Sequence, residues 1–147
     1  MHRSEDRPTA AYGIALLRVS LGLMWISHAL LKLLVFTMPG TAQYFESIGL
    51  PGALAYPVVT AEIVGGTALV LGVYARQVAV ALLPILAGAT WVHLPNGWVF
   101  TSPGGGWEFP AFLIVASFAL WLMGDGAVAI RRSSRFVPTL PAQGSVA

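Results

Sequence analysis

Three basic side chains, Arg18, His28 and Lys32, lie within the first long apolar stretch of the chain. On a helix they fall within an arc of roughly 80°, and Trp25 lies inside the same arc. Each charge would cost several kcal/mol against hydrocarbon, so this stripe is expected to face other helices or a wet cavity. Amine and imidazole groups held there can donate hydrogen bonds and transfer protons. The stripe is therefore the first candidate for a functional site.

An acidic residue, Glu62, lies inside the second apolar stretch. Gly65 and Gly66 project within about 80° of it, so the acidic face is also smooth enough for close approach to another helix. At a rise of about 1.5 Å per residue, His28 and Glu62 lie at similar depths. We predict that His28, Lys32 and Glu62 form the catalytic centre, in a cluster suited to an anion, a quinone carbonyl or a polar headgroup.

The composition indicates an integral membrane protein. The chain has 147 residues, of which 56% are hydrophobic and only 10% charged, whereas soluble domains carry about 25% charged residues. The net charge is only +2, so we expect membrane lipids and no nucleic acid as partners. The chain contains no cysteine, which excludes iron–sulfur clusters, covalent haem attachment and thiol chemistry by this chain.

The apolar runs predict an all-α fold, a four-transmembrane-helix bundle with spans at residues 11–36, 53–74, 78–94 and 109–123. Residues 1–10 and 125–147 are then tails, and we expect the second to be partly disordered. A short interfacial helix is predicted at residues 41–48, in the first outer loop. Arg76 and Gln77 are predicted to form a tight turn, and Pro84 to bend the third span.

The basic residues outside the spans predict the orientation. They all fall on one side of the predicted membrane: Arg3, Arg7, Arg76, Arg131, Arg132 and Arg135. The two opposite loops contain no lysine or arginine. The positive-inside rule therefore places both termini in the cytoplasm, and the longer loops outside.

Two further ionisable residues, His93 and Glu108, lie at the predicted outer ends of spans three and four. His28 and His93 fall in the same half of the membrane, which leaves open a b-type haem with two histidine ligands. With Glu62 and Glu108 they also leave open a nitrogen–oxygen metal site. No local ligand spacing supports either, and we predict no metal site.

Four motifs in order resemble the DoxX family of small membrane proteins. They are the His-x-x-x-Lys pair His28 and Lys32, Gly49-Leu50-Pro51, Ala61-Glu62 followed by Gly65-Gly66, and the pair of loops around His93-x-x-Asn96-Gly97-Trp98 and Gly105-Gly106-Trp107-Glu108. The resemblance implies a four-helix bundle in the bacterial inner membrane. It also implies a role as a small subunit of a quinone-linked oxidation system. We assign ligand contacts around the catalytic centre to Arg18, Trp25, His93, Asn96, Trp107 and Glu108.

Three functions remain open. The first is a subunit of a quinone-linked redox system, working with other subunits of a membrane complex or as a homo-oligomer, with the quinone headgroup in the polar cluster. The second is a non-catalytic anchor or assembly subunit, which predicts a dry cluster with Glu62 bonded directly to Arg18 or His28. The third is a small anion transporter. In plainer interpretations Lys32 is an end-of-helix residue that reaches the interface, and His93 only caps its helix.

Overall fold

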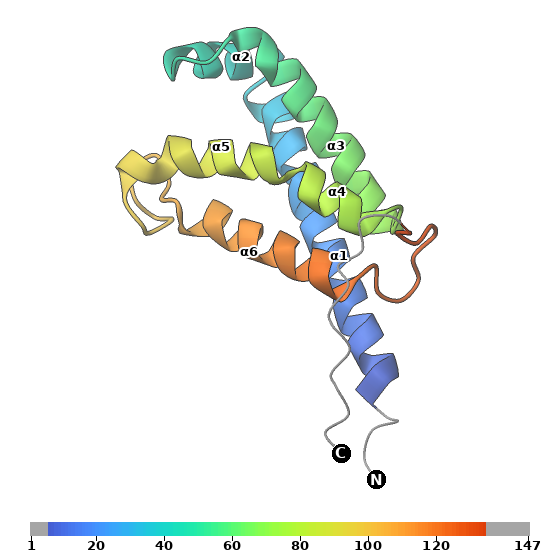
Figure 1. The fold of residues 1–147 in the computed structure, drawn as a ribbon. Helices are drawn as coiled ribbons and strands as arrows, with labels where there is room; N and C mark the ends of the chain where they lie inside the picture. The colour runs from blue at the N-terminus through green and yellow to red at the C-terminus, as the bar shows by residue number, and fades with distance from the viewer. Residues whose placement is uncertain (1–5, 135–147) are drawn as a thin grey trace.

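The structure, a computed structural model, describes residues 6–134, in which the regular secondary structure is helical apart from one isolated bridge between Val73 and Arg131. The elements in chain order are α1 (Asp6–Leu30), the π-helical turn η1 (Leu31–Val35), α2 (Met38–Ser47), the 3-10 turn η2 (Gly52–Leu54), α3 (Ala55–Leu71), α4 (Ala75–Ala81), α5 (Leu83–His93), the 3-10 turn η3 (Leu94–Asn96) and α6 (Glu108–Met123). In Figure 1, α1 and α3 run alongside each other, and α5 and α6 form a second pair that crosses α1.

Three helical segments are long and apolar enough to cross a membrane, namely Thr9–Val35, Gly52–Leu71 and Ala75–Asn96. They coincide with the first three predicted spans and support an all-helical, multi-pass membrane protein. Helix α6 lies where the fourth span was predicted, but its 16 residues are fewer than the roughly 20 that usually cross a bilayer.

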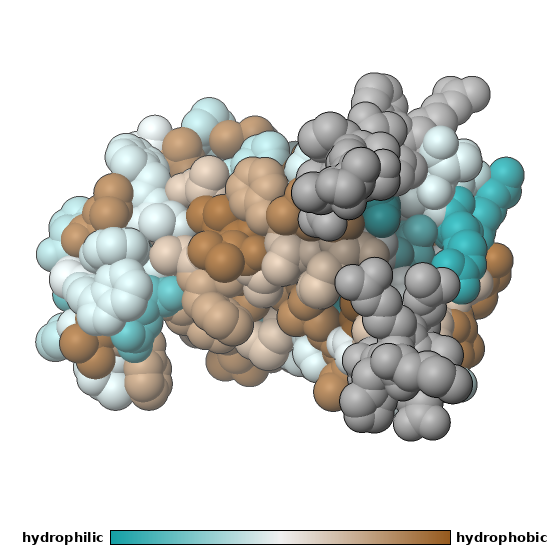
Figure 2. Space-filling view, turned by 60° about the horizontal axis from the view of Figure 1, so that its bottom comes forward, coloured by the Kyte–Doolittle hydropathy of each residue, from teal (hydrophilic) through white to brown (hydrophobic). Residues whose placement is uncertain are grey.

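The outer surface of the helices carries large hydrophobic side chains. Leu34 is 75% exposed and Phe112 is 65% exposed. Figure 2 shows hydrophobic residues gathered over the middle of one face, with more hydrophilic residues toward its two ends. Such a surface is unfavourable in water and is typical of a lipid-facing band.

Glycines bring α1 and α3 into direct backbone contact. A Cβ added to Gly66 would lie 2.8 Å from the carbonyl oxygen of Gly22, and one added to Gly22 would lie 2.7 Å from that of Gly66. A Cβ on the neighbouring Gly65 would instead meet Leu82 at 2.8 Å. The small residues expected on the second span therefore allow close packing against two neighbours, with Gly66 against α1 and Gly65 against Leu82.

The third span is interrupted at Leu82, between α4 and α5. Pro84 has no N–H to donate to the carbonyl of residue 80, which explains the break close to the predicted bend. The prediction of a tight turn at Arg76 and Gln77 is wrong, because both residues lie within α4. The chain turns earlier, at Gly72 and Tyr74, which have φ values of 70° and 49°.

The segment after α6, residues 124–133, folds back on the bundle, and we call this segment the clasp. Ala127 N–H donates to the Ala11 carbonyl at 2.8 Å, and Arg131 N–H donates to the Gly72 carbonyl at 3.0 Å. Tyr74 N–H in turn donates to the Arg131 carbonyl at 2.9 Å. The clasp thus joins α1 to the turn between α3 and α4. Of the tail predicted to be partly disordered, residues 135–147 lie outside the described residues.

Candidate functional site

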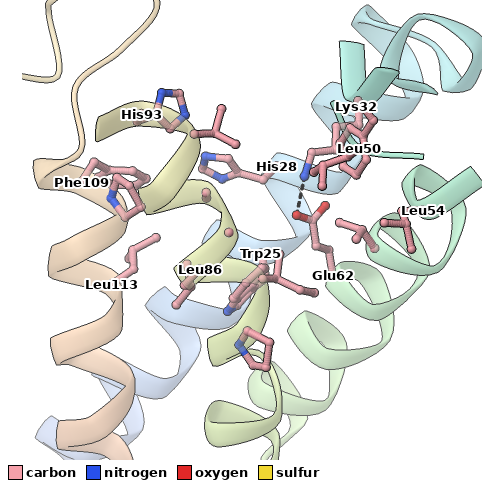
Figure 3. Close-up of a pocket in the computed structure, with 18 of the residues that line it drawn as sticks. Trp25, His28, Lys32, Leu50, Leu54, Glu62, Leu86, His93, Phe109 and Leu113 are labelled. Atoms are coloured by element: carbon pink, nitrogen blue, oxygen red, sulfur yellow. Dashed lines mark hydrogen bonds and ion pairs between the residues drawn. The ribbon is translucent and has the colours of Figure 1, made fainter. Parts of the chain in front are cut away.

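A cavity of about 480 Å³ lies between α1, α2, α3, α5 and α6 (Figure 3). Most of its lining is apolar, including Leu54, Leu86 and Leu113. The lining side chains that carry a nitrogen or oxygen atom are Trp25, His28, Lys32, Tyr44, Glu62 and His93. An apolar cavity with a few convergent polar groups is the usual form of a small-molecule site.

Lys32 and Glu62 form an ion pair at one side of this cavity. The Lys32 ammonium donates a hydrogen bond to Oε1 of Glu62, as the dashed line in Figure 3 shows. The Glu62 residue is only 2% exposed, whereas the Lys32 side chain is 22% exposed. The second carboxylate oxygen, Oε2, is buried and has no hydrogen-bond partner within residues 6–134. The pair therefore neutralises the buried charge and leaves one acceptor unused.

The backbone around Lys32 departs from a regular α-helix. Lys32 lies in the π-helical turn η1, and its carbonyl accepts a hydrogen bond from Thr41 Oγ1 of α2 at 3.3 Å. Single π-helical turns are frequent at functional sites, because they reorient one part of a helix without breaking it. This turn, tied to α2, helps to direct the Lys32 side chain toward Glu62.

His28 and His93 face the cavity from α1 and α5. Nδ1 of His28 is 2.9 Å from the Met24 carbonyl oxygen, and its ring stacks on Phe109 at 5.8 Å between centroids. Nδ1 of His93 is 3.1 Å from the carbonyl oxygen of Gly105. Because a carbonyl can only accept, Nδ1 is the donor in both hydrogen bonds. Nε2 is then the ring nitrogen of each histidine that is left for a ligand.

Trp25 completes the polar rim on the α1 side, where it is 6% exposed. The structure thus brings together His28, Lys32, Glu62, Trp25 and His93, five of the nine residues predicted for the site.

Arg18 does not reach the cavity, although it shares the helical arc of His28. The two residues are ten positions apart, which is about 15 Å along a helix. Nη2 of Arg18 donates to the carbonyl oxygens of Ala127 at 3.2 Å and Val128 at 3.4 Å. Arg18 is 2% exposed, so it belongs to the buried junction between α1 and the clasp.

Asn96, Trp107 and Glu108 organise the loop between α5 and α6 and do not line the cavity. Asn96 Nδ2 donates to the Gly105 carbonyl at 2.9 Å, and Glu108 Oε1 accepts a 2.7 Å hydrogen bond from Phe100 N–H. Trp107 packs edge-on against Trp98 with ring centroids 4.4 Å apart. Asn96 shares its carbonyl acceptor with His93, so the loop holds the histidine in place.

Sequence reasoning missed the contribution of α2 and of the clasp. Tyr44 and Phe45 of α2 line the cavity, whereas the sequence indicated only an interfacial helix. Asp125 accepts hydrogen bonds from the N–H and hydroxyl of Ser133 at 2.8 and 2.7 Å, which closes the clasp. An acidic residue between two glycines, Gly124 and Gly126, was the available signal for an ordered turn there.

No group of three or more histidine, cysteine, aspartate or glutamate side chains is arranged to hold a metal ion within residues 6–134. His28 and His93 line one cavity and both have Nδ1 bonded to a carbonyl. Histidines that bind a metal through Nε2 are commonly oriented in this way. A haem held by these two histidines stays an open alternative.

Comparison with known proteins gives two matches. The model of the DoxX family matches residues 13–94. A protein of Bacillus subtilis (strain 168), described as "Putative oxidoreductase CatD", is 35% identical over 119 residues, which cover 80% of this chain and 84% of the relative. No solved structure matches the chain significantly.

Proposed function

The chain belongs to the DoxX family, and from this premise we propose that it is a small inner-membrane subunit of a quinone-linked redox system. The proposed ligand site is the cavity beside the Lys32–Glu62 pair. The observation that carries the proposal is the unpaired, buried Oε2 atom of Glu62, a residue that lines an apolar cavity of about 480 Å³. The oxidoreductase description of the Bacillus subtilis relative supports the redox class.

The cavity offers what a quinone headgroup needs. Its apolar lining suits the ring, and the ammonium of Lys32 can donate a hydrogen bond to a quinone carbonyl. Reduction of a quinone to a hydroquinone takes up two electrons and two protons. Glu62 and His28 are the groups that we expect to exchange those protons at the ligand oxygens, while Trp25 and His93 contact the ring.

The electrons would come from outside this chain. With no cysteine in the sequence, the chain cannot supply an iron–sulfur cluster or a covalently attached haem. We therefore propose a partner subunit as the electron donor or acceptor, bound to the exposed apolar surface of the bundle or to the tails. The alternative of a homo-oligomer uses the same surface.

The proposed topology has α6 as the fourth span and both termini in the cytoplasm. The loop that contains Trp98 and Trp107 would then lie at the outer interface, where tryptophan is enriched. Six arginines fall on the opposite side of the predicted membrane, which supports this orientation. The cavity would lie in the outer half of the membrane, open to quinone from the bilayer.

The non-catalytic anchor remains the alternative. It predicted a dry cluster with Glu62 bonded to Arg18 or His28. Glu62 is instead bonded to Lys32 beside a cavity, which favours a ligand site.

The test is the quinone content of the purified protein. The protein is extracted into lipid nanodiscs under reducing, oxygen-free conditions, and bound hydroquinone is measured by mass spectrometry in the wild type, Glu62→Gln and Glu46→Gln. Loss of the hydrogen bond from a hydroquinone hydroxyl to the charged carboxylate should reduce occupancy in Glu62→Gln by about tenfold or more. Glu46 is exposed and outside the cavity, so Glu46→Gln should retain wild-type occupancy. A folded wild-type protein without quinone, even after addition of excess quinone, would refute the proposal.

A further inference from the structure

The two histidines that line the cavity each present an acceptor atom to a ligand. Nδ1 of His28 donates to the Met24 carbonyl, and Nδ1 of His93 donates to the Gly105 carbonyl. A neutral imidazole carries only one N–H, so Nε2 of each ring has a lone pair and no hydrogen to donate. Two imidazoles from different helices are therefore held in the same tautomer by backbone carbonyls.

Glu62 provides a third acceptor atom. Oε1 of Glu62 is occupied by Lys32, and Oε2 is buried without a partner in the described part of the chain. A buried carboxylate oxygen without a donor is costly, and a ligand that supplies an O–H group would remove that cost. Glu62 is 2% exposed, so bulk water does not readily compensate for it.

Lys32 gives the cavity a donor next to this acceptor. It uses one N–H on Glu62, and an ammonium has three. A hydroquinone hydroxyl can accept from Lys32 and donate to Oε2 of Glu62, because a hydroxyl is both donor and acceptor. A quinone carbonyl can only accept, so it would leave Oε2 unpaired and place a second lone pair against it.

From this pattern we infer that the cavity binds the reduced, dihydroxy form of its ligand, a hydroquinone, more tightly than the oxidised quinone. The inference rests on the proposed function and specifies which redox state the site stabilises. A site of this kind favours the form that carries two protons, and Glu62 and the Nε2 atoms are the acceptors for those protons.

The test compares the two redox forms directly. A short-chain benzoquinone and its hydroquinone are titrated separately into the protein in nanodiscs, with oxygen excluded from the hydroquinone titration, and the dissociation constants are measured by calorimetry. The hydrogen bond from a hydroxyl to Glu62 predicts about 10- to 100-fold tighter binding of the hydroquinone. Glu46→Gln is the matched control, and it should keep the same preference.

Glu62→Gln should abolish the preference. The amide can keep its oxygen toward Lys32 and present its NH₂ group where Oε2 was, and this donor suits a quinone carbonyl. We expect the ratio of the two dissociation constants to fall at least tenfold. His28→Phe is a second variant, in which the ring can still stack on Phe109 but lacks Nε2, and it should lower the same ratio if Glu62→Gln does not fold.

The outcomes separate the two proposals. Equal affinity for quinone and hydroquinone, or a preference that persists in both variants, overturns the inference while the proposed function stands. Failure of the folded wild type to bind either form overturns the proposed function, and the inference with it. Tighter hydroquinone binding that is lost in Glu62→Gln and kept in Glu46→Gln supports both.

Discussion

Arg18 and Glu62 are each 2% exposed, and their surroundings give them different roles. Arg18 donates to the carbonyl oxygens of Ala127 and Val128, so its positive charge holds the clasp to α1. Glu62 accepts from Lys32 and keeps one oxygen unpaired beside the cavity. Arg18 also has two buried nitrogens, Nε and Nη1, without a partner in the described residues, so it is the position of Glu62 in the cavity lining that distinguishes it as a ligand-binding candidate.

The position of Arg18 depends on Gly72. Gly72 has a φ of 70°, and a Cβ at this position would overlap Nη1 of Arg18. Gly72→Ala should therefore lower the free energy of unfolding by about 2 kcal/mol or more, through backbone strain and displacement of the guanidinium. The measurement is the thermal unfolding midpoint in detergent.

The control for this prediction is Gly13→Ala. Gly13 is exposed within α1, and an added Cβ would meet no atom within 4 Å. Alanine is the better helix former by about 1 kcal/mol, so this variant should be as stable as the wild type or more so. Equal destabilisation by both substitutions would contradict the assigned role of Gly72.

At the scale of elements, the approach of α1 to α3 sets the distance across which Lys32 reaches Glu62. Gly22 and Gly66 let the two backbones touch, and Lys32 and Glu62 pair further along the same two helical segments. The crossing and the site are thus mechanically linked, because any separation of α1 from α3 also separates the ammonium from the carboxylate.

Gly66→Ala tests this link. The new Cβ would lie 2.8 Å from the Gly22 carbonyl oxygen and 2.9 Å from Trp25 Cβ, so the helices must move apart. Overpacking of this kind costs about 1–3 kcal/mol, and we expect a lower unfolding midpoint together with reduced quinone occupancy. Gly13→Ala, where a Cβ meets nothing within 4 Å and the residue does not line the cavity, should lower neither the midpoint nor the occupancy. A Gly66→Ala protein with wild-type stability and occupancy would contradict this link, because α1 and α3 would then accommodate the methyl group without disturbing the site.

At the scale of the molecule, the proposed orientation places the two ends of the bundle in different compartments. The chain has no cysteine, so single cysteines can report which side each end faces. Thr101 lies in the loop before α6 and Ser134 follows the clasp, and both are exposed.

Thr101→Cys should react with a membrane-impermeant maleimide in spheroplasts, whose outer membrane or cell wall has been removed and whose inner membrane is intact. Ser134→Cys should react only after the membrane is opened, because arginine-rich segments are retained in the cytoplasm. The measurement is the mass shift of each labelled protein on a gel. Labelling of both sites in intact spheroplasts would refute α6 as the fourth span, because the two sites would then lie on the same side of the membrane with no crossing between them.

Much of this arrangement was predictable from the chain, and the rest depended on tertiary contacts. His28, Lys32 and Glu62 were correctly expected to lie together, because their angular positions on the helices and their depths along the helix axes both pointed to one place. Both quantities follow from helix periodicity and rise. Arg18 shared the arc but not the depth, so it fell outside the cavity. Asp125 between two glycines indicated a turn, but the docking of the clasp could not be predicted, because it depends on backbone carbonyls that are distant in sequence, those of Ala11 and Gly72.

The contact between Arg18 and Ala127 also has a consequence for the order in which the protein is made. The partners are 109 residues apart, and at about 5–20 residues per second the second is synthesised about 5–20 s after the first. During that interval the first membrane segment holds a guanidinium whose carbonyl partners do not yet exist. The initial insertion of α1 must therefore tolerate an uncompensated charge that only the last part of translation relieves.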